Sequence, residues 1–254
     1  MSKRNMKNIA LDLYESGGWI NIPSIASLGC WCNILIGKRQ VGKTYGTLKY
    51  ELNEGKRFLY LRRTTTEFDA ITSDPDLNPF LPLKKEGFDA DIVKGGKVTY
   101  TIGRFEYEDG KPKQCLEKYG IGMTLPSIAN IRGFNGSQFE DVVFDEFISE
   151  RIVIKRKAEG DALLNAYVTI NGNRELEGKP PLRLWLLANA FDIASPILVE
   201  LGGRNRQAVQ DGQRVDGNRK RRVHWYAQIQ RGKCQACADR FHASHDEKQG
   251  FKVL

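Results

Sequence analysis

The chain has 254 residues, of which 41% are hydrophobic and 28% are charged, an ordinary globular composition that excludes disorder along the whole length. It contains no run of about 18 apolar residues, so a membrane-embedded protein is excluded too. The formal net charge of +8 is concentrated in residues 203–254, which hold 12 Lys and Arg against 5 Asp and Glu.

The N-terminal part spells a strand, a loop, a helix and a second strand. A short helix is predicted over Asn8–Glu15, and the polar start lacks the apolar centre of a secretory signal, which favours a cytoplasmic protein. The apolar run Asn33–Ile36 predicts a buried strand, residues 45–54 a helix that ends at Gly55, and Arg57–Arg62 a second strand. This order is a βαβ unit and implies a parallel sheet with a right-handed crossover.

The middle of the chain, Asp74–Leu125, lacks this regular alternation. Short apolar runs flank an Asp-Gly pair at 109–110 and predict a β-hairpin that decorates the parallel core. The core resumes with a strand in Asp141–Phe147, a helix over Ala158–Ile170 and a strand in Leu182–Ala190. The predicted fold class is therefore α/β, with a mainly parallel central sheet flanked by helices, a β-hairpin insertion and a short basic C-terminal tail.

A phosphate-binding motif follows the first strand and opens the helix. The pattern G-x-x-x-x-G-K-[ST] is matched by Gly37, Lys38, Arg39, Gln40, Val41, Gly42, Lys43 and Thr44. Backbone N–H groups of such a loop wrap a phosphate, and the helix N-terminus adds partial positive charge. Lys43 is expected to reach the β- and γ-phosphates, and Thr44 to offer its hydroxyl to Mg²⁺. A chance match is the alternative, but the motif has the correct strand and helix on either side.

Polar residues follow two later strands, at the sheet edge where ligands of open α/β sheets bind. Asp145 is expected to hold Mg²⁺, and Glu146 to orient or deprotonate the attacking water. This acidic pair indicates an ATPase rather than a GTPase, with an exposed acidic strand end as the alternative. Asn189 is a candidate contact of the γ-phosphate or the catalytic water, and a plain turn asparagine is its alternative.

One arginine is expected to neutralise charge in the transition state, from the same subunit or from a neighbour. The candidates are Arg39, the pair Arg62 and Arg63, Arg132, and Arg174. A surface role is the alternative for each of them.

The ordered motifs resemble a known family. The segments IGKRQVGKTYGTLKY, FLYLRR, VVFDEFI and LLANA are similar to the DNA-packaging ATPases, or terminase large-subunit motors, of tailed bacteriophages, and most like those of the small Bacillus podophages. The likeness covers residues 33–202. It implies an additional-strand P-loop ATPase that uses ATP and Mg²⁺ and forms a homo-oligomeric ring on the portal of a prohead. It also implies that the ring drives double-stranded DNA inward, in the host cytoplasm, transiently on the prohead and without a membrane.

The resemblance also assigns roles to single residues. The phosphate, magnesium, Walker B, catalytic glutamate and coupling positions of the family match, in this order, Lys43, Thr44, Asp145, Glu146 and Asn189. The family's trans-acting arginine lies in an Arg-Asn-Arg-Glu context, and residues 172–175 here read Gly-Asn-Arg-Glu. Arg174 is therefore the first candidate for this role, and Arg132 is its competitor.

The composition divides the chain into a P-loop ATPase domain, residues 1–202, and a basic tail, residues 203–254. The basic run Asn218–Arg222 and the aromatic residues after it suit phosphate contacts and base stacking, and a disordered solvated run is the alternative. Four tail residues are candidate zinc ligands: Cys234, Cys237, His242 and His245. A third interpretation is that the tail is the remnant of a truncated or frame-altered gene.

Three functions stay open at this stage. The first is an ATPase of a viral packaging motor, the second another P-loop ATPase for secretion, assembly or replication, and the third a truncated nucleotide-binding domain without turnover. No nuclease activity is expected, because the tail lacks clustered carboxylates and is shorter than the family's usual nuclease-like domain.

Overall fold

The computed structural model describes residues 13–130, 136–148, 159–172, 174, 176–189, 195–201, 209–210 and 225–229. The strands are β1 (Cys32–Ile36), β2 (Phe58–Arg62), β3 (Asp91–Lys94), β4 (Thr99–Glu108), β5 (Lys111–Thr124), β6 (Asp141–Asp145), β7 (Arg183–Ala188), β8 (Val209–Gln210) and β9 (Trp225–Ile229). The helices are α1 (Ile22–Ala26), α2 (Lys43–Asn53), α3 (Thr65–Ser73), α4 (Leu81–Lys85), α5 (Leu125–Asn130), α6 (Glu159–Asn171) and α7 (Pro196–Glu200), with a 3-10 turn, η1 (Pro75–Leu77).

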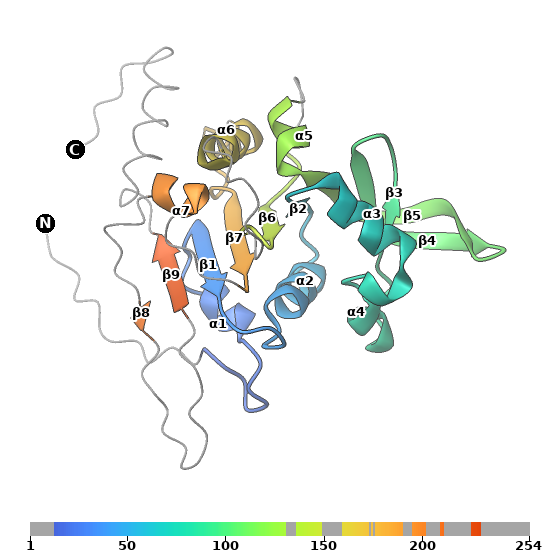
Figure 1. Ribbon diagram of the computed structural model, residues 1–254, viewed down its shortest axis with the longest axis horizontal. Helices are drawn as coiled ribbons and strands as arrows, with labels where there is room; N and C mark the ends of the chain where they lie inside the picture. Colours follow the sequence, from blue (N-terminus) through green and yellow to red (C-terminus); the bar gives the residue numbers. More distant parts are fainter. Residues whose placement is uncertain are drawn as a thin grey trace, which may run out of the picture.

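The described strands form one sheet in the order β3-β4-β5-β2-β6-β7-β1-β9-β8 (Figure 1). The five central strands, from β5 to β1, are parallel, and the strands at both edges are antiparallel. β7 lies between β1, which precedes the phosphate loop, and β6, which carries the Asp-Glu pair. This order confirms the predicted additional-strand arrangement. β1 and β6 are buried at every position, as expected for strands covered on both faces.

Helices cover both faces of the central strands (Figure 1). On one face, α5, α6 and α7 pack against residues such as Phe144 and Leu186. On the other face, α1 to α4 pack against residues such as Val143 and Leu187. Because side chains of a strand alternate between faces, Asp145 lies with Val143 on the face that α2 covers. The phosphate-loop helix and the acidic strand end therefore share one face.

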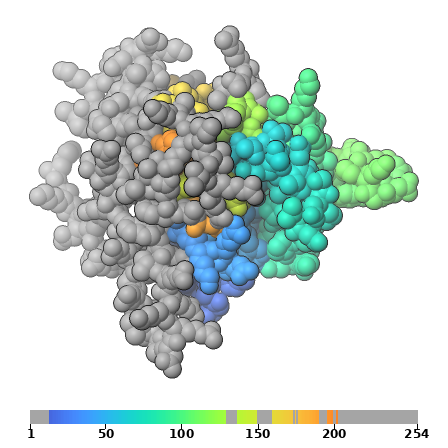
Figure 2. Space-filling view, in the orientation of Figure 1, coloured from blue at the N-terminus to red at the C-terminus, as the bar shows by residue number. Residues whose placement is uncertain are grey.

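The predicted hairpin is confirmed, but part of it belongs to the core. β4 and β5 meet at Asp109 and Gly110, whose φ angles of 51° and 74° fit the Asp-Gly turn of a two-residue hairpin. The tip projects outward beyond the rest of the described surface (Figure 2). The second half of β5 pairs in parallel with β2 over Gly120–Thr124. The expectation of a pure decoration is therefore wrong, because the insertion also supplies a strand of the parallel core.

The structure describes both ends of the chain only in part. Residues 8–12 of the predicted first helix lie outside the described residues, and Tyr14 forms an antiparallel bridge with Ile20 instead of a helical turn. In the tail, β9 pairs with β1, and β8 pairs with β9. The boundary between residues 202 and 203 stays a prediction. The basic run 218–222 and the four candidate zinc ligands lie outside the described residues, and no helix within the described ranges is long and apolar enough to cross a membrane.

Candidate functional site

The loop between β1 and α2 has a backbone suited to an anion. Gly42 has a φ of 83° and Gln40 a φ of 64°, in the left-handed region that glycine tolerates best. α2 begins directly after Gly42, whose position supplies no side-chain cap for the first N–H groups of the helix. These N–H groups and the helix dipole together favour a negatively charged ligand at this point.

The ammonium group of Lys43 lies inside this loop. Its Nζ donates to the carbonyl oxygens of Gly37 and Lys38 at 2.9 and 2.8 Å. The residue is only 7% exposed, and a buried cation requires such partners. The positive charge of Lys43 is therefore held within the loop by the loop's own carbonyl groups.

The carboxylate of Asp145 joins this loop to the end of β6. Thr44 Oγ1 donates to Asp145 Oδ1 at 3.0 Å, although the two residues are 101 positions apart. The hydroxyl of Tyr60 donates to Asp145 Oδ2 at 2.9 Å, and the backbone N–H of Glu146 donates to Oδ1 at 3.1 Å. The structure thus brings the predicted magnesium residues together at the C-terminal edge of the sheet.

Arg62, the last residue of β2, bridges the two acids. Its Nη2 lies 3.4 Å from Asp145 Oδ2, and its Nη1 lies 3.4 Å from Glu146 Oε2. The Glu146 side chain is 44% exposed, and its φ of 53° is unusual for a residue with a Cβ. Such backbone conformations cluster at functional sites, and here the turn leaves the carboxylate beside the site and open to solvent.

Asn189 follows β7, close to the start of the phosphate loop. The N–H of Gly37 donates to the carbonyl of Ala188 at 3.1 Å, so the residue after Ala188 lies next to the loop. The N–H of Phe147, just beyond the acidic pair, donates to the carbonyl of Leu187 on the same strand. Asn189 is half-buried, and its position fits the predicted contact.

These groups fit Mg²⁺ and a triphosphate. Mg²⁺ prefers hard oxygen ligands, usually one or two protein oxygens completed by substrate phosphates and water. The Thr44 hydroxyl and the Asp145 carboxylate lie 3.0 Å apart, and Lys43 and the N-terminus of α2 supply positive charge for phosphate. Among the described residues, no cluster of three or more His, Cys, Asp and Glu could form a metal site made of protein ligands alone.

Comparison with known proteins agrees with this geometry. Residues 19–201 match the family described as podovirus DNA encapsidation protein (Gp16). The chain belongs to this family. It is 30% identical over 169 residues to the DNA packaging proteins of Bacillus phages phi29 and PZA, which covers 65% of this chain and 44% of each relative. The chain therefore spans less than half the length of these curated relatives.

Solved structures support the family fold. The N-terminal domain of the DNA packaging ATPase from bacteriophage phi29 matches with a TM-score of 0.53 and 25% identity, over 77% of this chain and 92% of that domain. A chain of the bacteriophage phi29 genome packaging motor assembly matches with a TM-score of 0.55 and 21% identity, over 93% of this chain and 69% of that one.

Two aromatic residues of this Gp16-family site were not predicted. Tyr60 lies two residues before Arg62, so the alternation of β2 puts both side chains on one face, a signal that was present in the sequence. Trp19 packs against the phosphate loop, and a Cβ on Gly42 would lie 2.4 Å from its ring. The ring of Trp19 also lies 5.4 Å from that of Tyr45 in α2.

Of the two arginines predicted to act in trans, Arg174 and Arg132, the structure of this Gp16-family chain describes Arg174. Arg174 is 4% exposed, and its guanidinium donates to the carbonyls of Pro180 at 3.0 Å, Phe139 at 2.8 Å and Ser137 at 3.4 Å. Phe139 precedes β6 and Asp145 ends it, so Arg174 lies roughly 20 Å along the strand from the acidic pair. This position does not bring Arg174 to the site of its own subunit. Arg132 lies outside the described residues.

Removal of the Arg174 guanidinium is expected to destabilise the fold. Arg174→Met keeps the apolar stem but removes the three hydrogen bonds that the guanidinium donates, one of them to the carbonyl of buried Phe139, which costs about 2–4 kcal/mol of unfolding free energy. Urea unfolding would measure this loss, with Arg57→Met as the control, because Arg57 is exposed and its guanidinium donates to the Gln138 side chain at 3.0 Å. Wild-type stability combined with lost ATP turnover would instead support the predicted role of Arg174 in trans.

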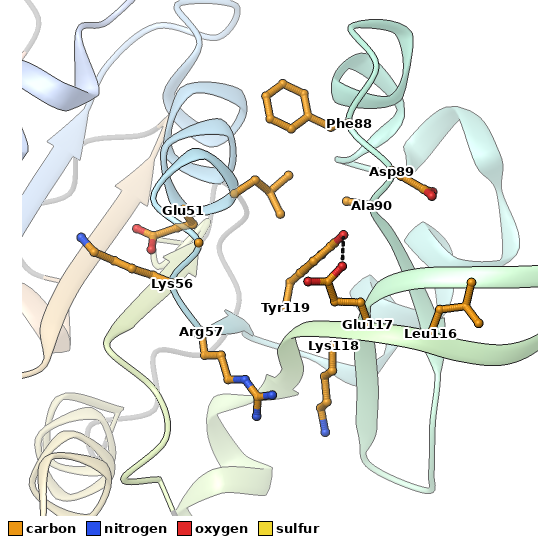
Figure 3. Close-up of a pocket in the computed structure, with 12 residues that line it drawn as sticks. Glu51, Lys56, Arg57, Phe88, Asp89, Ala90, Leu116, Glu117, Lys118 and Tyr119 are labelled. Carbon is orange, nitrogen blue, oxygen red and sulfur yellow. Dashed lines mark hydrogen bonds between the residues drawn. The ribbon is translucent and has the colours of Figure 1, made fainter.

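A groove of about 570 Å³ lies away from the phosphate loop, at the other end of α2 (Figure 3). It lies between the end of α2 with residues 55–57 on one side and residues 88–90 with β5 on the other. On β5, the hydroxyl of Tyr119 donates to the neighbouring Glu117 carboxylate at 3.3 Å. The carboxylate of Glu51 is fully buried beside it and accepts no hydrogen bond from the described residues. Burial, and then the negative charge of Asp141, raise the pKa of Glu51 well above its usual range.

This shift predicts a pH dependence of stability. Because the folded chain binds the Glu51 proton more tightly than the unfolded chain, the contribution is complete below the unfolded pKa of about 4.3 and is lost as the pH rises toward the folded value. The loss is at most about 1.4 kcal/mol per pH unit. Glu51→Gln is expected to reduce the change of the urea midpoint with pH between pH 5 and 8. Glu54→Gln, at the exposed C-cap of α2, is expected to leave this pH dependence unchanged. An equal slope in wild type and Glu51→Gln contradicts this assignment.

Proposed function

We propose that this chain is the ATPase of a viral genome-packaging motor, which couples hydrolysis of Mg²⁺-ATP to the movement of double-stranded DNA into a preformed capsid. The observation that carries the proposal is the 3.0 Å contact between Thr44 Oγ1 and Asp145 Oδ1, which unites two motifs distant in the chain. Membership of the Gp16 family and the likeness to the phi29 packaging ATPase domain support it.

The residues divide the work of hydrolysis. Lys43 and the N–H groups of α2 bind and orient the phosphates, and Thr44 and Asp145 hold Mg²⁺, which neutralises phosphate charge when it is bound. Glu146 accepts the proton of the attacking water. Its carboxylate is the acid at the site that is open to solvent, and Arg62 orients it. Asn189 contacts the γ-phosphate side of the site and couples its state to β7.

The arginine that neutralises transition-state charge is proposed to come from a neighbouring subunit. Arg174 is held near the start of β6 in its own subunit. Arg132 is the competing candidate for this role. A site completed by a neighbour requires an oligomer, which agrees with the proposed ring.

The proposed partners are double-stranded DNA and the portal of the prohead, in the host cytoplasm. A motor that moves any genome must grip phosphates rather than bases, because phosphate contacts carry no sequence information. The structural relative from the phi29 genome packaging motor assembly supports a place for this chain in such an assembly.

ATP turnover tests the proposal directly. Turnover of the purified chain would be measured alone, with double-stranded DNA, and with DNA plus portal-bearing proheads, together with nuclease protection of the DNA. We expect stimulation by DNA and further stimulation by proheads. Turnover that ignores both additions would indicate another kind of P-loop ATPase, and ATP binding without turnover at any protein concentration would indicate a nucleotide-binding domain only.

A further inference from the structure

The two oxygens of the Asp145 carboxylate have different partners. Oδ1 faces Thr44 and the N–H of Glu146, whereas Oδ2 accepts the hydroxyl of Tyr60 at 2.9 Å. Rotation of an aspartate carboxylate about its last bond is soft, because this torsion has broad minima. A donor at Oδ2 therefore acts together with the two donors at Oδ1 to fix the rotation of the carboxylate.

The ring of Tyr60 is itself held in place. It is fully buried and meets the ring of Phe68 edge-on, with centroids 5.9 Å apart and planes at 87°. Phe68 in turn stacks on Tyr100 of β4, with centroids 4.3 Å apart. A Cβ at Gly122 of β5 would lie 2.7 Å from the Phe68 ring, so a larger residue there would displace this stack. The Tyr60 hydroxyl thus has a fixed position in space.

We propose that Tyr60 is a positioning residue for the metal-binding carboxylate: its hydroxyl fixes the rotation of Asp145 so that Oδ1 stays turned toward Thr44. This inference rests on the proposed function, because a metal must bind at Asp145 for the orientation to matter. Arg62 does not replace the hydroxyl. Its Nη2 lies 3.4 Å from Asp145 Oδ2, and its Nη1 pairs with Glu146.

A buried tyrosine that only stabilises the core is the competing explanation, and the chain offers a matched control. Tyr167 is also buried, and its hydroxyl donates to the carbonyl of Leu182 at 2.8 Å. Tyr167 belongs to α6 and packs in the core on the face of the sheet opposite to Tyr60. Tyr60→Phe and Tyr167→Phe each remove one bonded, buried hydroxyl, but only Tyr60→Phe removes a donor to Asp145.

Metal binding, rather than turnover, is the measurement. Binding of Mn²⁺ in the presence of a non-hydrolysable ATP analogue would be followed by electron paramagnetic resonance, and binding of the analogue alone would be measured in EDTA. Loss of a group that orients a metal ligand typically weakens metal binding 10- to 100-fold. We expect at least a tenfold loss of Mn²⁺ affinity in Tyr60→Phe, unchanged analogue binding in EDTA, and no loss of Mn²⁺ affinity in Tyr167→Phe.

A double-mutant cycle closes the test. In an Asp145→Ala background, Tyr60→Phe is expected to have no further effect on Mn²⁺ affinity, because the carboxylate through which the hydroxyl acts has been removed. Equal Mn²⁺ affinity in Tyr60→Phe and wild type, with both folded by thermal melting, would overturn the role of Tyr60 and leave the proposed function intact. Failure of the wild-type chain to bind Mn²⁺ with the analogue would overturn both.

Discussion

Glu146→Gln is expected to bind Mg²⁺-ATP as tightly as the wild-type chain and to lose about 10²- to 10⁴-fold in turnover, the usual contribution of a positioned general base. The amide of Gln fills the same space but does not accept the proton of the attacking water. Binding is expected to be preserved, because the phosphate contacts are proposed to come from Lys43 and α2, and the metal contacts from Thr44 and Asp145. Single-turnover hydrolysis and equilibrium binding, measured on the same preparation, would separate the two effects.

The control for this substitution lies at the other end of β6. Glu140 is exposed, and its backbone forms hydrogen bonds with the backbone of Arg57 and of Arg183. Glu140→Gln is therefore expected to leave turnover unchanged. If Glu146→Gln hydrolysed ATP at the wild-type rate, the water-activating group would have to be sought elsewhere in the site.

Lys43→Ala is expected to reduce nucleotide affinity by about 10- to 150-fold, since a charge-assisted hydrogen bond contributes about 1.5–3 kcal/mol and each 1.4 kcal/mol is a factor of ten. The ammonium group is buried in the loop and is already oriented by the Gly37 and Lys38 carbonyls. Little side-chain entropy is therefore lost when it binds phosphate. Titration with a fluorescent ATP analogue would measure the affinity.

Lys49→Ala is the matched control, because Lys49 lies on the same helix but is paired with Glu86 at the surface. It is expected to bind nucleotide like wild type. Thermal melting of both variants would show whether loss of the Lys43 ammonium also loosens the loop. Wild-type affinity in a folded Lys43→Ala chain would contradict the phosphate-binding assignment of this loop.

Local patterns predicted most of the parallel core. The four central strands that the pattern named, β1, β2, β6 and β7, are five or six residues long in the structure, and their bounds differ from the expected ones by a residue or two. These strands are buried on both faces, so burial alone specifies them. The segment between β2 and β4 was not resolved into elements, because its short helices α3 and α4 carry too few turns for a helical period to emerge.

The site shows the same division. The phosphate loop and the Asp-Glu pair could be predicted from their residue types and from the strand that precedes each. Arg174 was chosen from its neighbours in the sequence, yet the fold has its guanidinium bonded to carbonyls near the start of β6. A short arginine context says nothing about which end of a strand the side chain will meet.

The amino-acid sequence by itself determined the family, the α/β class and the candidate residues for binding phosphate and metal, because these depend on short motifs and on the burial of single strands. The tertiary structure alone decided that Tyr60 and Arg62 reach Asp145, that β5 joins the core, and that Glu51 is buried beside Asp141. The first two features depend on which strands are neighbours of β2 in the sheet, and the third depends on where α2 packs against β6. Strand order arises from the packing of the whole chain, so no local stretch of residues contains it.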